Sequence, residues 1–194
     1  MAPYVLPKLI RKFKSHYPKV ELEILEDTTE SLALRLEDGT LDIAIMSTCQ
    51  QSPALEPHPL AKEALLVLLP KQHRLAKKKN ISWSDLKPEK FLLLHEVHCL
   101  SVQVCQLLAE HDLRPELALR GAQLTTIAHM VATGLGVSFV PQMMIEHQLP
   151  NGCVALPLIP PAPIRELNLL RNPLRLQTKA AAAFYQEAAA AFAR

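Results

Sequence analysis

The chain has 194 residues, of which 49% are hydrophobic and 21% are charged, and its formal net charge is +2. This length and apolar content are enough for one or two domains with a buried core. No apolar run approaches the ~18 residues that a membrane-spanning helix needs, and the net charge is too small to argue for nucleic-acid binding by this piece itself.

The start of the chain and its cysteine content both bear on the cellular compartment. Pro3 and Pro7 follow Met1 without a basic or apolar leader segment, so we expect a cytoplasmic protein. The four cysteines lack the density of a secreted disulfide framework and are expected to be thiols, so that any disulfide would be transient or regulatory. They are Cys49, Cys99, Cys105 and Cys153.

The first part of the chain alternates between helical and strand patterns. Residues 4–16 carry apolar side chains at helical spacing, and residues 20–24 alternate apolar and charged side chains as in a strand with one exposed face. Thr29 is a candidate N-cap for a short helix, with Gly39 as its C-terminal stop. Two buried strands are then expected at residues 41–46 and 64–69, separated by a loop with Pro53, Pro57 and Pro59.

The second part of the chain repeats this alternation. Strands that alternate with helices favour mainly parallel α/β sheets, and ligands in such folds bind beyond the carboxyl ends of the strands. Two such cycles predict two lobes around a cleft. The expected elements are strands at residues 91–94, 116–119, 137–140, 153–157 and 166–170, helices at 100–111 and 125–133, and an alanine-rich helix that closes the chain.

Several motifs follow one another in a specific order. They are APYVLP at residues 2–7, LEDGTLDIA at 36–44, LAKE, LVLLP and HRLA between 60 and 76, and MVATGLGV with a following VP at 130–141. Together they resemble the effector-binding domain of LysR-type transcriptional regulators, and the resemblance covers essentially the whole chain.

The LysR resemblance implies an architecture and partners. The fold would be α/β, with two Rossmann-like subdomains joined by two crossover strands as in periplasmic binding proteins: residues 1–68 plus 171–194, and residues 69–170. The first strand of the domain would be missing, and the DNA-binding winged helix-turn-helix would lie outside this chain. The family implies no enzyme activity, cofactor, metal or membrane. It implies a homodimer or homotetramer that meets promoter DNA and RNA polymerase through the full-length protein.

A second set of motifs narrows the resemblance. HCLSVQ at residues 98–103 resembles the HCLxxQ segment of OxyR-type hydrogen-peroxide sensors, and PAPIR at 161–165 and LRNPLR at 170–175 are also similar to that group. The resemblance implies that Cys99 is the peroxide-reactive thiol. In the family, the helix start near Thr125 and Thr126 can also bind an anion. The implied ligand pocket is then Thr29, His98, Gln103, Thr125, Thr126 and Arg171.

The chemistry of Cys99 supports part of this assignment. Cys99 lies between a strand and a predicted helix start, where backbone N–H groups and the helix dipole favour a thiolate, and His98 would add positive charge. A thiolate attacks peroxide to give a sulfenic acid, which a second thiol condenses to a disulfide. The second cysteine of OxyR-type sensors usually lies nine residues after the first, where this chain has Leu108. Cys105, six residues after Cys99, is the candidate resolving thiol.

Other functions remain open at this point. The domain would sense a small organic effector in the cleft if Cys99 were incidental, since a cysteine in an apolar segment is most often a core residue. A thiol peroxidase is the alternative from another class, although no C-x-x-C motif is present. A metal site at His95, His98, Cys99 and Cys105 lacks zinc-finger spacing. A solute-binding transport protein would share the two lobes.

Overall fold

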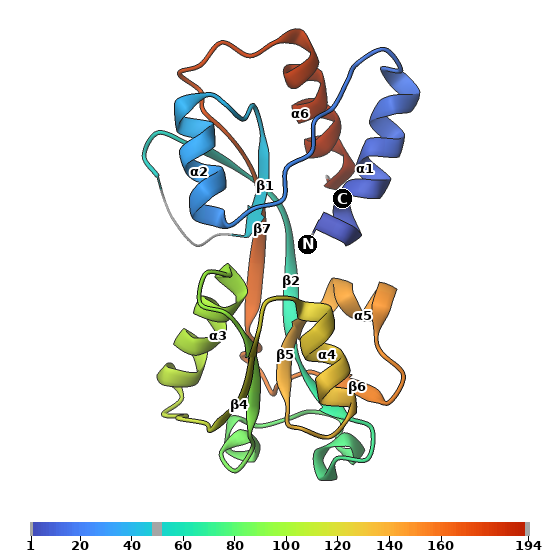
Figure 1. Ribbon diagram of the computed structural model, residues 1–194, viewed down its shortest axis with the longest axis vertical. Coiled ribbons are helices and arrows are strands. Elements are labelled where there is room, and N and C mark those ends of the chain that lie inside the picture. The colour runs from blue at the N-terminus through green and yellow to red at the C-terminus, as the bar shows by residue number, and fades with distance from the viewer. Residues whose placement is uncertain (1, 48–51, 193–194) are drawn as a thin grey trace. The chain divides into compact units, whose positions relative to one another are not determined.

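The computed structural model describes residues 2–47 and 52–192, and it divides into two compact units. Unit 1 comprises Met1–Lys62 and Glu166–Arg194, and unit 2 comprises Glu63–Arg165. Two strands, β2 (Glu56–Pro70) and β7 (Ile164–Arg171), contribute residues to both units (Figure 1). The LysR resemblance implied divisions after residues 68 and 170.

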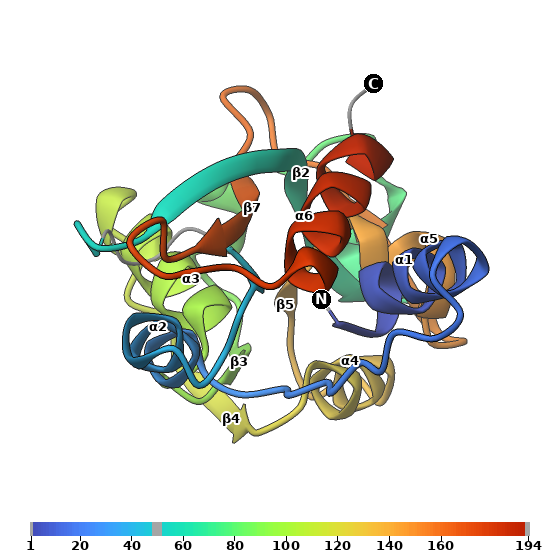
Figure 2. The ribbon, with the colours of Figure 1, turned by 90° about the horizontal axis from the view of Figure 1, so that it is seen from above.

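Unit 1 packs helices around a short strand. Its elements besides β2 and β7 are α1 (Ala2–His16), α2 (Thr29–Asp38), β1 (Ala44–Ser47) and α6 (Lys179–Phe192). β1 pairs antiparallel with β7. The buried side chains of α1 recur every four residues at Val5, Leu9 and Phe13, so they share one face of the helix. That face meets α6, where the Phe13 and Phe184 ring centroids lie 5.1 Å apart (Figure 2).

The caps of α2 differ from the prediction at one end. Thr28, not Thr29, is the N-cap: its hydroxyl oxygen accepts a hydrogen bond from the Ser31 N–H at 3.3 Å. Thr29 is instead the first helical residue. Gly39 is confirmed as the C-terminal stop, because it adopts the left-handed conformation with φ of 80° and donates its N–H to the Arg35 carbonyl.

Unit 2 places helices beside two strand groups. β5 (Ser138–Pro141) and β6 (Cys153–Leu156) pair antiparallel with β2, and β3 (Phe91–Leu94) pairs parallel with β4 (Leu117–Gly121). The large side chains of Phe91, Phe139 and Ile127 are fully buried between these elements. The elements are η1 (Arg74–Lys77), η2 (Trp83–Leu86), β3 (Phe91–Leu94), α3 (Cys99–Glu110), β4 (Leu117–Gly121), α4 (Leu124–Ala132), β5 (Ser138–Pro141), α5 (Gln142–Gln148) and β6 (Cys153–Leu156), where η1 and η2 are short 3-10 helices.

The expectation of mainly parallel sheets is wrong for β1, β5 and β6, which pair antiparallel with β7 or β2, whereas β3 and β4 pair in parallel as expected. The parallel rule assumes that each strand returns to the sheet through a helix. β2 and β7 are instead long strands that continue from one unit into the other, and β1, β5 and β6 run against them. Among the described residues no helix is both long and apolar enough to cross a membrane.

Two further expectations for the first part of the chain are wrong. Residues 20–28 form no strand, and Ile24 and Leu25 remain 51% and 41% exposed. The alternating pattern describes one face of a strand but cannot supply the partner whose hydrogen bonds define it. Pro57 and Pro59 were expected to lie in a loop, but both belong to β2. The first four residues of β2 are exposed, and proline is tolerated at exposed strand positions.

Gly136 is required by a close backbone approach between two segments of unit 2. A Cβ at this position would overlap the Lys90 carbonyl oxygen and lie 2.7 Å from Leu92 Cδ1. The same strand end is fixed by a 2.8 Å hydrogen bond from the Val137 N–H to the Lys90 carbonyl. The backbone therefore cannot move away without losing this pairing.

We expect Gly136→Ala to lower the free energy of unfolding by about 2–3 kcal/mol, the cost of overpacking a fixed site. Gly134→Ala is the matched control in the same turn. Gly134 has φ of +87° but no atom within 4 Å of an added Cβ, so only about 1 kcal/mol of backbone strain should result. Urea denaturation of both variants measures the difference, and equal losses would contradict the close-approach argument.

Candidate functional site

Cys99 is the first residue of α3, and its side chain is half-buried. The preceding residue, His98, has an extended backbone, and its side chain makes no capping hydrogen bond to the helix. The His98 carbonyl instead accepts the N–H groups of Ser101 at 2.9 Å and Val102 at 3.2 Å. The sulfur therefore lies at the end of α3 where the helix dipole favours negative charge.

Two side-chain hydrogen bonds fix the first two turns of α3. The buried Ser101 hydroxyl donates to the Leu94 carbonyl at 2.7 Å, which ties the helix start to the end of β3. Gln103 Nε2 donates to the Ile164 carbonyl at 2.8 Å, which ties the second turn to the start of β7. Ser101 was not singled out from the sequence, because a buried serine bonded to a distant carbonyl leaves no spacing signal.

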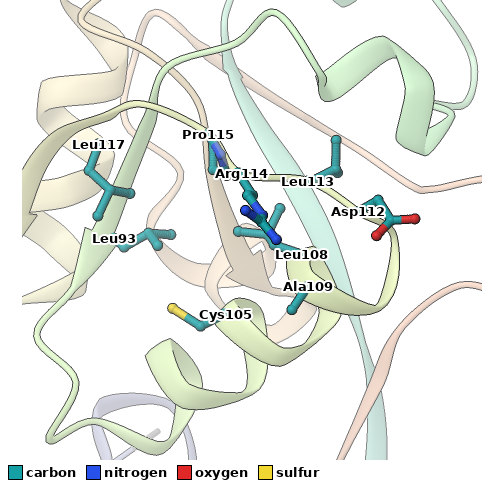
Figure 3. A pocket seen from close by; sticks show the side chains of 9 residues that line it. All are labelled: Leu93, Cys105, Leu108, Ala109, Asp112, Leu113, Arg114, Pro115 and Leu117. Carbon is teal, nitrogen blue, oxygen red and sulfur yellow. The ribbon is translucent and has the colours of Figure 1, made fainter.

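Cys105 lies further along α3 and faces a cavity of about 260 Å³. Its sulfur points toward β3 and β4, from which Leu93 and Leu117 line the same cavity (Figure 3). Leu108, the position at which OxyR-type sensors usually carry their second cysteine, also lines this cavity. Cys105 and position 108 therefore share one side of α3, as residues three apart on a helix do.

Arg120 on β4 is a second residue that the sequence did not reveal. Its guanidinium pairs with the Glu96 carboxylate. This hydrogen bond and the negative charge of Glu96 raise the pKa of Arg120.

The folded α3 keeps Cys99 and Cys105 apart. Six residues of an α-helix rise ~9 Å and turn ~600°, so the two side chains leave on different sides. A disulfide needs Cα atoms within about 7 Å. No disulfide joins Cys99, Cys105 or Cys153, the cysteines that the structure describes.

The remaining cysteines are placed differently. Cys153 is buried, its sulfur lies 3.5 Å from the Ala128 carbonyl, and burial raises the pKa of its thiol. These features fit a packing role. Cys49 lies outside the described residues. Within residues 2–47 and 52–192, no group of three or more His, Cys, Asp or Glu side chains is arranged to hold a metal ion.

Thr125 and Thr126 lie in the first turn of α4, and both are exposed. Gln123 is the N-cap of this helix, and Thr125 and Thr126 are its second and third residues. The Gln123 side chain makes no capping hydrogen bond. The Thr125 carbonyl accepts a 2.8 Å hydrogen bond from His129 Nδ1 within the helix.

Thr29 and Arg171 belong to unit 1, whereas His98, Gln103, Thr125 and Thr126 belong to unit 2. Arg171 is half-buried, and the following partners all belong to unit 1. Its Nε donates to Glu56 Oε2 at 2.8 Å, and its guanidinium carbon lies 4.6 Å from the ring centroid of Tyr185. Arg171 also donates to Gln177 Oε1 at 3.4 Å.

Comparisons with known proteins agree with this fold. Residues 1–193 match the family described as the LysR substrate binding domain. The chain is 31% identical over 174 residues to the DNA-binding transcriptional dual regulator OxyR of Escherichia coli (strain K12), covering 89% of this chain and 57% of that relative. The chain thus spans less than two thirds of the length of this relative.

Two solved structures show the likeness in three dimensions. The reduced form of the OxyR regulatory domain from Pseudomonas aeruginosa superposes with a TM-score of 0.83 and 29% identity, covering 98% of this chain and 93% of that one. The regulatory domain of Synechocystis CcmR in complex with 2-PG gives a TM-score of 0.90 over 99% and 93% of the two chains, but at 22% identity it supports the fold alone. These likenesses confirm the α/β fold class expected from the sequence.

Proposed function

Because the chain belongs to the LysR substrate-binding domain family, we propose that it is the sensing domain of a DNA-binding transcription factor and that it detects hydrogen peroxide through Cys99. The observation that carries this proposal is the position of Cys99 at the uncapped start of α3, inside the HCLSVQ segment. The relatives named as peroxide-responsive regulators support the same function.

The proposed reaction takes place at the Cys99 sulfur. The thiolate attacks one peroxide oxygen, the O–O bond breaks, and the sulfur keeps that oxygen as a sulfenic acid. The other oxygen leaves as hydroxide and takes up a proton to become water. His98, which precedes Cys99 in the chain, would supply positive charge, and Gln103 positions the following turn through its bond to Ile164. Thr29, Thr125, Thr126 and Arg171 remain proposed pocket residues.

The proposed function carries further consequences for the whole protein. The domain would act in the cytoplasm as part of a homodimer or homotetramer and would change its geometry on oxidation. Contacts with promoter DNA and RNA polymerase would be made through the full-length protein. The domain itself would react with peroxide as a sensor and would not catalyse repeated peroxide reduction by a thiol reductant.

We expect dilute hydrogen peroxide to add one oxygen to Cys99, or to convert it to a disulfide, in wild-type protein. Cys99→Ser should abolish this change, because the serine hydroxyl is not deprotonated at neutral pH and does not attack peroxide. Intact-mass spectrometry followed by peptide mapping provides the measurement. Cys153→Ser is the matched control: its thiol is buried and should leave the oxidation of Cys99 unchanged.

Two outcomes would redirect the proposal. If Cys99 resists peroxide while a small metabolite raises the melting temperature, the domain senses an organic effector and Cys99 is incidental. If the protein consumes peroxide over many turnovers with a thiol reductant, it is a thiol peroxidase.

A further inference from the structure

The cavity beside Cys105 is partly open to solvent and is large enough for a small molecule. Its volume of about 260 Å³ exceeds the ~150 Å³ of an engineered apolar cavity that holds benzene, so it has room for one aromatic ring with a short side chain. Leu93, Leu108 and Leu113 form its buried apolar wall. Leu117, which is 38% exposed, lies at the opening.

Two charged side chains, Arg114 and Asp112, line this cavity, and both are exposed to solvent. The guanidinium of Arg114 points toward Leu108 and the side of α3 that carries Cys105 (Figure 3). Among the described residues Arg114 has no hydrogen-bond or ion-pair partner, whereas most arginines of unit 2 do. The carboxylate of Asp112, at the rim, points away from the guanidinium (Figure 3). A guanidinium without a protein partner beside a wall of leucines is complementary to a molecule with one apolar part and one carboxylate.

We propose that this cavity, formed by α3, β3, β4 and the loop before β4, binds a small apolar monocarboxylate. The hydrocarbon part lies against the leucine wall, and the carboxylate accepts hydrogen bonds from Arg114. The site is distinct from the Cys99 thiol.

The test uses 3-phenylpropanoate as the probe and its neutral amide as the comparison ligand. Calorimetric titration measures affinity, and the rate at which iodoacetamide alkylates Cys105, followed by peptide mapping, reports on occupancy of this cavity. We expect the acid to bind, to slow alkylation of Cys105 and to outcompete the amide.

Three variants locate the site. Arg114→Gln should weaken binding of the acid by at least about ten-fold, because it removes a charge-assisted hydrogen bond. Ala109→Leu fills the cavity from an exposed helix position and should abolish binding while the protein stays folded. Arg11→Gln removes an equal charge from an exposed position of α1 and should change nothing.

The proposal is overturned if the acid does not bind, or if it binds equally well to Arg114→Gln and Ala109→Leu. It is also overturned if Cys105 alkylation proceeds at the same rate with saturating acid. Equal affinity for acid and amide would contradict the role assigned to Arg114.

Discussion

Arg165→Met is expected to lower the free energy of unfolding by about 3–5 kcal/mol, the cost of leaving a buried charge without its partner. The Arg165 and Glu63 side chains are only 5% and 9% exposed, and Arg165 Nε lies 2.6 Å from Glu63 Oε1. The second Glu63 oxygen accepts the Met143 N–H at 3.0 Å. Without Arg165, the Glu63 carboxylate keeps this single bond and no counter-charge.

The neighbouring ion pair provides a matched control. Lys62 Nζ lies 2.7 Å from Glu166 Oε1, but these side chains are 65% and 40% exposed. Lys62→Met should therefore cost less than about 1 kcal/mol. The double variant Glu63→Leu with Arg165→Met should recover much of the loss, because it removes both buried charges. Urea denaturation measures all three, and an Arg165→Met variant within 1 kcal/mol of wild type would contradict the prediction.

The ion pair between Glu63 and Arg165 could not be predicted from the sequence. The LAKE and PAPIR motifs contain Glu63 and Arg165, but 102 residues separate them along the chain. Their contact depends on the pairing of β2 with the segment before β7, where the Leu65 N–H donates to the Pro163 carbonyl at 2.9 Å. A long-range register of this kind leaves no local periodicity.

Local patterns predicted α1, α2, α3, α4 and α6, but α5 was not predicted. The apolar spacing of α1, α3 and α4 and the stop at Gly39 each follow from interactions within one or two turns, which a sequence records directly. The strand expected at residues 20–24 failed because a strand requires a partner. The start of β2 was missed because proline is a loop signal except at exposed strand positions.

The same distinction applies to the candidate site. His98, Cys99 and Gln103 are close in sequence, so their common position at the start of α3 could be predicted. Arg171 was assigned to the pocket by resemblance, whereas its observed partners are Glu56, Gln177 and Tyr185. Glu56 is 115 residues away from Arg171 in the chain, and no local pattern indicates such a contact.

Formation of a disulfide between Cys99 and Cys105 is expected to unwind the start of α3, because the intact helix holds the two thiols too far apart for this bond. Unwinding would also have to break or strain the Ser101 bond to the Leu94 carbonyl and the Gln103 bond to the Ile164 carbonyl. A local thiol reaction would thereby release two tethers between α3 and the strands, and this change is the proposed switch.

Amide hydrogen exchange after peroxide treatment tests this directly. In the wild type, amides between residues 99 and 108 should lose protection by about 100-fold or more, as expected for a helical segment that opens. In Cys105→Ser, oxidation should stop at the sulfenic acid of Cys99 and the helix should stay protected. A Cys99–Cys105 bond formed with residues 99–108 still fully protected would refute the switch. If wild type and Cys105→Ser both stop at sulfenic acid, Cys105 serves only to line the cavity, and the sensor works through Cys99 alone or through a thiol of another chain.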